Sequence, residues 1–88
     1  MNTPNRTLAK NLQDGMLIDL RPLVDRLIKE GHVAEGEQED LVDSVSFEYA
    51  EVEAIVFETN DDGEKVVVIY NDIVNLAVGE DWEVELNA

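Results

Sequence analysis

The chain of 88 residues contains no cysteine, no long apolar run and few basic residues. Without cysteine there is no disulfide bond, no thiolate metal site and no thiol nucleophile. No apolar stretch approaches the roughly 20 residues that a membrane-spanning helix needs. The first residues also lack the apolar segment of a secretory signal. We therefore expect a cytoplasmic protein that does not bind membranes.

Basic residues are scarce and unevenly placed. Six Lys and Arg face 21 Asp and Glu, which gives a net charge of −15. Residues 1–29 carry five bases and three acids, whereas residues 30–88 carry 18 acids and a single base, Lys65. A surface as acidic as this repels nucleic acids and attracts cationic proteins. We therefore expect the partner to be a cationic protein surface and not a nucleic acid.

The sequence also lacks the residues that most catalytic and metal sites require. His32 is the only histidine, so a zinc site would lack its usual histidine and cysteine ligands. The acidic loop around Gly63 fits a calcium-binding loop only in part, because Ile69 stands where the bidentate glutamate is needed. No glycine-rich phosphate loop or nucleophile motif is present. We predict that the protein is not an enzyme and uses no metal or cofactor.

The hydrophobic fraction of 44% is enough for the packed core of one small domain. We expect this domain to span residues 8–88, after a flexible arm of residues 1–7. A first strand is expected over residues 16–20, where a short apolar run follows the turn at Asp14 and Gly15.

A helix is predicted over about residues 20–30. Apolar side chains recur there at the spacing of one helical face, and Gly31 can end the helix. The polar and acidic residues 32–43 that follow predict an irregular, mobile connection with at most one helical turn. The apolar helical face consists of Leu20, Leu23, Val24, Leu27 and Ile28.

The second half of the chain predicts β-strands. From Ser44 apolar and polar residues alternate, and the alternation changes phase near Tyr49, which indicates a bulge or sharp bend in a long strand. Residues 59–64 are typical of a hairpin loop with Gly63 at a positive φ. Three further strands are expected over residues 65–70, 73–78 and 82–86, with a turn at Asn71 and Asp72. Tyr70 and Trp82 are expected in the core and not on a contact surface.

These elements predict an α+β fold that is mainly β. Two architectures fit the pattern: a small SH3-like five-stranded barrel, or a strongly bent antiparallel sheet. In both, one amphipathic helix is inserted after the first strand. Closing the sheet into a barrel would remove the exposed edges that a short β-protein otherwise presents.

Glutamates alternate with apolar residues on the bent strand and on the last strand, so they are expected to point outward. Strand residues two apart lie roughly 6–7 Å apart on one face, a regular spacing of the kind that imitation of a nucleic-acid backbone requires. Plain solubility is the other explanation of so acidic a surface. The candidate partner-binding residues are Glu48, Glu51, Glu53, Glu58, Glu83 and Glu85.

Several short segments of the chain resemble short acidic accessory proteins of unassigned function encoded by phages of actinobacteria. The resemblance is carried by Leu12-Gln13-Asp14-Gly15-Met16-Leu17-Ile18-Asp19-Leu20, Glu48-Tyr49-Ala50-Glu51-Val52, Val68-Ile69-Tyr70, Val74-Asn75-Leu76 and Glu83-Val84-Glu85. It implies a small β-rich phage protein that acts in the cytoplasm of its host. It implies no active site.

The sequence is consistent with two functions. The first is an acidic, non-catalytic interaction module that binds a basic surface of a host protein, with imitation of nucleic acid as one mode of binding. The second is a structural or homo-oligomeric phage accessory protein with no electrostatic target. A monomer is favoured over a homodimer.

Overall fold

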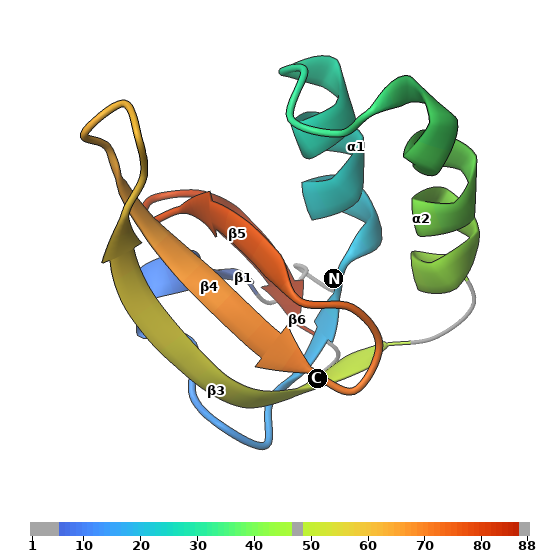
Figure 1. Cartoon of the computed structure of the whole chain (residues 1–88). Helices are drawn as coiled ribbons and strands as arrows, with labels where there is room; N and C mark the ends of the chain where they lie inside the picture. Colours follow the sequence, from blue (N-terminus) through green and yellow to red (C-terminus); the bar gives the residue numbers. More distant parts are fainter. Residues whose placement is uncertain (1–5, 47–48, 87–88) are drawn as a thin grey trace.

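The computed structural model describes residues 6–46 and 49–86 and shows an α+β protein that is mainly β (Figure 1). Six antiparallel strands form one sheet in the order β1-β6-β2-β3-β4-β5, and two helices pack beside each other. The strands are β1 (Arg6–Leu8), β2 (Leu17–Asp19), β3 (Ala50–Thr59), β4 (Lys65–Asn71), β5 (Leu76–Gly79) and β6 (Glu83–Leu86). The helices are α1 (Arg21–Lys29) and α2 (Gln38–Val45), with 3-10 turns η1 (Ala9–Asn11) and η2 (Glu35–Glu37).

Strand β3 is long and joins the two parts of the sheet. Its first residues pair with β2, and from Val52 to Thr59 it pairs with β4. The register shifts between Val52 and Ala54, and β3 curves there across the molecule (Figure 1). The predicted bend is confirmed, although it lies a few residues after Tyr49.

The sheet is open, so the closed barrel is not confirmed. Strands β1 and β5 lie at the two ends of the strand order, and each pairs with a single strand among the described residues. The number of strands is six and not five, because residues 6–8 form β1, where a flexible arm was expected to extend to residue 7. Strand β1 pairs with β6 at the opposite end of the chain, with Arg6 opposite Glu85. Because this pairing joins distant segments, the local sequence of residues 6–8 does not predict a strand.

Helix α1 forms where the apolar spacing predicted it. Leu23, Val24 and Leu27 are buried, and the Asp19 carboxylate accepts a hydrogen bond of 3.0 Å from the backbone N–H of Arg21 at the first turn. Gly31 ends the helix with a φ of 81°, a conformation that costs glycine little.

Helix α2 corrects the prediction of an irregular connection over residues 32–43. Residues 35–45 form η2 and α2, and Ser44 and Val45, which the alternation assigned to a strand, belong to the helix. Val45 is buried, and Leu41 and Val42 are half-buried against the core. Leu41, Val42 and Val45 lie at helical spacing, so the sequence does contain an apolar helical face for α2. With only three residues, that face is too short to predict a helix.

The core lies between the sheet and the apolar face of α1. The central strand β4 is buried at Val67 and Ile69 and half-buried at Val66 and Val68, as its apolar sequence predicted. Neither helix of the described part is long and apolar enough to cross a membrane. The largest fully buried side chains are Ile18, Leu20, Val24, Val45, Val52, Val67, Ile69, Val78 and Val84.

We predict that Val67→Ala destabilises the protein much more than Val56→Ala. Val67 is fully buried, whereas Val56 on the neighbouring strand is 40% exposed. Removing two buried methyl groups from position 67 should lower the free energy of unfolding by about 2 kcal/mol. The control, Val56→Ala, should lower it by less than half of that. Urea unfolding measures both; equal losses would show that β4 does not hold the core.

Candidate functional site

Three of the predicted acidic residues lie on one face of the sheet. Glu83 and Glu85 are two residues apart on β6, and Glu51 lies on β3 on the far side of β2. Leu17 is opposite Glu51 and Asp19 is opposite Glu85, so all of them point to the same side, away from buried Ile18 and Val84. We call Asp19, Glu51, Glu83 and Glu85 the acidic face.

A cation from the outer strand β1 lies at the edge of the acidic face. The two terminal nitrogens of Arg6 are 3.5 Å from Glu83 Oε2 and 3.3 Å from Glu85 Oε1. These ion pairs are exposed to solvent, so each contributes about 0–1 kcal/mol to stability. Their main effect is to lower the negative charge that β6 presents to a partner.

The other predicted acids are not gathered with these three. Glu58 is seven residues beyond Glu51 on β3, roughly 23 Å along the strand. Glu53 is exposed at the register shift, and Glu48 lies outside the described residues. The predicted set of six is therefore only partly brought together.

A second acidic surface was not assigned from the sequence. The η2–α2 segment carries exposed acids and no base, and none of them forms an ion pair within the described part of the chain. Acids in the first turn of α2 also interact favourably with the positive end of its helix dipole. These residues are Glu35, Glu37, Glu39, Asp40 and Asp43.

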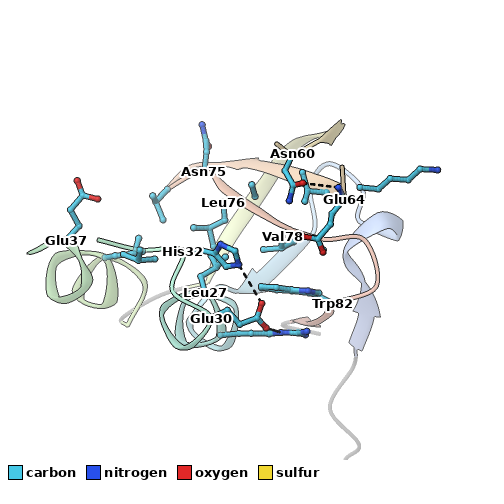
Figure 2. A pocket seen from close by; sticks show the side chains of 18 residues that line it. Leu27, Glu30, His32, Glu37, Asn60, Glu64, Asn75, Leu76, Val78 and Trp82 are labelled. Atoms are coloured by element: carbon cyan, nitrogen blue, oxygen red, sulfur yellow. Dashed lines mark hydrogen bonds and ion pairs between the residues drawn. The ribbon is translucent and has the colours of Figure 1, made fainter. Parts of the chain in front are cut away.

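A groove of about 640 Å³ lies between the helical segment and strand β5 (Figure 2). One wall comes from α1 and the residues after it, and the other from β5 and the β3–β4 hairpin. Leu27, Leu76, Val78 and Trp82 lie close together in it, and carboxylates of Glu30, Glu37 and Glu64 project around it.

Trp82 lies flat in this groove between β5 and α1. The guanidinium carbon of Arg26 is 4.0 Å from the centre of its ring, an attractive cation–π distance. Gly79 leaves room for the ring, because a Cβ at that position would lie 2.6 Å from Cδ1 of Trp82. Trp82 was predicted to be a core residue; it packs against the core but is half-buried, and it also lines the groove.

Arg26 also binds Glu30 through a hydrogen bond of 2.8 Å. This hydrogen bond lowers the pKa of the Glu30 carboxyl, and the nearby charges of Arg26 and His32 add to the effect. The Nε2 atom of His32 is 3.6 Å from Glu30 Oε1. A carboxyl with a lowered pKa is unsuited to act as a general acid.

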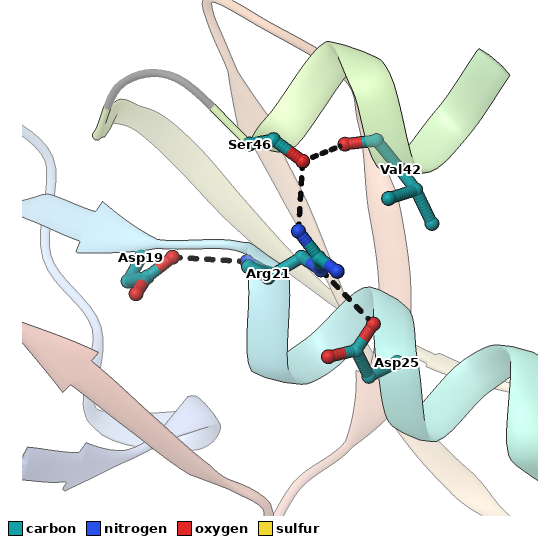
Figure 3. Close-up of polar contacts among 5 residues, drawn as sticks. All are labelled: Asp19, Arg21, Asp25, Val42 and Ser46. Carbon is teal, nitrogen blue, oxygen red and sulfur yellow. Dashed lines mark hydrogen bonds and ion pairs between the residues drawn. The ribbon is translucent and has the colours of Figure 1, made fainter. Parts of the chain in front are cut away.

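The two helices that form one side of the groove are linked by a polar cluster (Figure 3). Arg21 of α1 donates to Ser46 Oγ at 2.9 Å and pairs with Asp25 at 3.1 Å, and the Ser46 hydroxyl donates to the carbonyl of Val42 in α2. The cluster joins the start of α1 to the end of α2.

The turn before β5 is fixed by the one polar residue that is buried in the described part, Asn71. Its Oδ1 accepts hydrogen bonds from the backbone N–H groups of Ile73 and Val74 at 2.8 and 2.9 Å. Its Nδ2 donates to the carbonyls of Ile69 and Val74 at 3.2 and 2.8 Å. The sequence showed the turn, but not that a buried side chain sets the position of β5.

Comparisons with protein-family models, with curated proteins and with solved structures find no match for this chain. In residues 6–46 and 49–86, no three His, Asp or Glu side chains gather so that they could hold a metal ion. A function is therefore inferred from the charges and surfaces alone.

We predict that Gly79→Ala displaces Trp82 and costs about 1–3 kcal/mol of stability. The new methyl group meets a ring held by Arg26, so the ring must move. Gly36→Ala is the matched control, because nothing lies within 4 Å of the added carbon there. Thermal unfolding and the emission of the single tryptophan measure both effects; an unchanged spectrum for G79A would contradict this packing.

Proposed function

We propose that this protein is a non-catalytic acidic interaction module that binds a basic surface of another protein. The observation that carries the proposal is that Glu51, Glu83 and Glu85 share one solvent-facing side of the sheet in a chain of net charge −15. Paired strands fix the backbone positions from which these carboxylates project, so little backbone entropy is lost when a partner binds.

The resemblance of the sequence supports a further proposal about its setting. We infer a phage accessory protein that acts on a host protein in the host cytoplasm. The open, bent sheet is compatible with a distorted SH3-like arrangement, which stays a hypothesis. Imitation of a nucleic-acid backbone is the mode of binding we favour, because Glu83 and Glu85 lie two residues apart on one side of β6, a regular spacing of anions that a cationic groove can accept.

Exposed apolar residues on β3 and β4 favour a second candidate, a homo-oligomeric structural protein. Phe57 is 56% exposed, Val56 40% and Tyr70 37%, and Tyr70 had been expected in the core. Apolar side chains that lie close together on a surface often form an interface between copies. We favour the monomer because these three do not share one face: Phe57 is opposite buried Val67, whereas Val56 and Tyr70 point to the other side.

We predict that light scattering at tens of micromolar gives the mass of one chain, and that Phe57→Ser leaves the mass unchanged. A dimer of the unaltered protein that Phe57→Ser converts to a monomer would contradict the monomer and support the second candidate.

We predict that the triple variant Glu51→Gln, Glu83→Gln, Glu85→Gln loses at least about tenfold in affinity for a host protein captured by the unaltered chain. Each change removes one charge and keeps the size of the side chain. The expected loss corresponds to about 0.5 kcal/mol for each exposed charge. The melting temperature should hold or rise, because repulsion in an acidic protein is relieved.

Two controls decide which surface the partner contacts. The variant Glu35→Gln, Glu39→Gln, Asp40→Asn also removes three charges but lies on η2–α2, and its affinity should fall less than about threefold. Arg6→Gln unmasks Glu83 and Glu85 and should strengthen binding. Equal losses for both triple variants would show that net charge and not the acidic face attracts the partner.

A further inference from the structure

Strand β5 has one edge that no other strand covers. It pairs with β4 on one side and lies at the end of the strand order. In an antiparallel strand, alternate residues direct their N–H and C=O groups to opposite edges. Part of the backbone of Leu76–Gly79 therefore points away from β4. No described residue outside the β4–β5 ladder forms a backbone hydrogen bond with Leu76, Ala77 or Val78.

This free edge lies in the groove beside Trp82. Five consecutive residues, 75–79, line the groove, so the backbone of β5 itself forms part of its wall. The opposite wall belongs to α1 and the segment that follows it, including Val33 and Leu41, which are half-buried. Figure 2 shows Leu76 and Val78 directed toward Leu27 and Trp82. These three aliphatic side chains are buried, so the apolar surface that the groove exposes comes from half-buried residues that line it, such as Trp82, Val33 and Leu41.

The charges around the groove select its occupant. Glu30, Glu37 and Glu64 line it together with the cations Arg26 and Lys65, and Arg26 is engaged by Glu30 and by the face of Trp82. Glu37 and Glu64 form no ion pair among the described residues. Lysine or arginine side chains of a bound segment would meet these two carboxylates from opposite walls.

We propose that the groove binds an extended, lysine- or arginine-bearing segment of a partner protein, which pairs with β5 as an added antiparallel or parallel strand. Strand addition takes its affinity from backbone hydrogen bonds and its selectivity from the side-chain sites along the edge. Four residues of β5 span roughly 13 Å, so about four residues of the segment can pair. The groove shares no residue with the acidic face, so this proposal does not depend on the proposed function.

The test uses a defined probe, an acetylated and amidated hexapeptide of sequence Lys-Val-Thr-Val-Lys-Thr. Trp82 is the only tryptophan, so its fluorescence reports on the groove directly. We expect a saturable change of emission and slower amide hydrogen exchange at β5. The same peptide with glutamate at both lysine positions should not bind.

Two N-methylated versions of the peptide test strand pairing. Methyl groups on one alternate set of amides face β5 and should abolish binding, whereas methyl groups on the other set point away from β5 and should weaken binding much less. Equal binding of the two versions would overturn strand addition.

A pair of charge-reversal variants tests the groove with net charge held constant. Glu37→Lys with Glu64→Lys changes the groove, and Glu35→Lys with Glu58→Lys makes the same change on η2 and the hairpin outside it. The first variant should bind the peptide at least about tenfold more weakly, and the second should lose less than about threefold. Equal losses would overturn the groove as the binding site.

Two further outcomes separate this proposal from other possibilities. The variant with glutamine at positions 51, 83 and 85 should bind the peptide as well as the unaltered chain does, and a large loss would overturn the independence of the two sites. A dimer that forms without peptide and protects the β5 amides would show that a second copy occupies the edge, which would also overturn the proposal.

Discussion

The register shift of β3 between Val52 and Ala54 is the constraint on which the rest of the structure depends. It allows one strand to pair with β2 at its start and with β4 over most of its length, so two short ladders enclose a single core. The apolar face of α1 then covers that core. Because the bent sheet does not close, β1 and β5 remain as outer strands, and the edge of β5 becomes available next to α1.

Much of the fold could be predicted from the sequence, because its signals are local. The apolar spacing from Leu20 to Ile28 places α1 within one residue or two of its observed ends, and Gly63 adopts the positive φ (82°) that the hairpin needs. The alternation at Val84 and Leu86 gives the correct orientation of β6. The change of phase near Tyr49 indicated a bent strand, although its position was a few residues early.

The parts that could not be predicted depend on contacts between distant segments. Arg6 belongs to a strand only because Glu85 lies opposite it, and α2 is fixed by Val45 in a core that other elements supply. Of the candidate site, the outward direction of Glu51, Glu83 and Glu85 was predictable from alternation, but the cation between two of them was not. The groove could not be predicted either, because α1, the edge strand β5 and Trp82 are distant in the sequence and meet only in the folded chain. Gly79 was its one local sign, as the residue that makes room for the indole ring.

We propose that carboxylates fixed on one face of the paired strands, and not net charge alone, draw this protein to its partner. The most direct measurement is the affinity of the isolated complex as a function of salt. Because the contributing carboxylates are exposed, screening should weaken binding steeply, by at least about tenfold between 50 and 500 mM salt. Replacement of Glu51, Glu83 and Glu85 by glutamine should flatten that dependence. An affinity that is constant over this range would contradict the account.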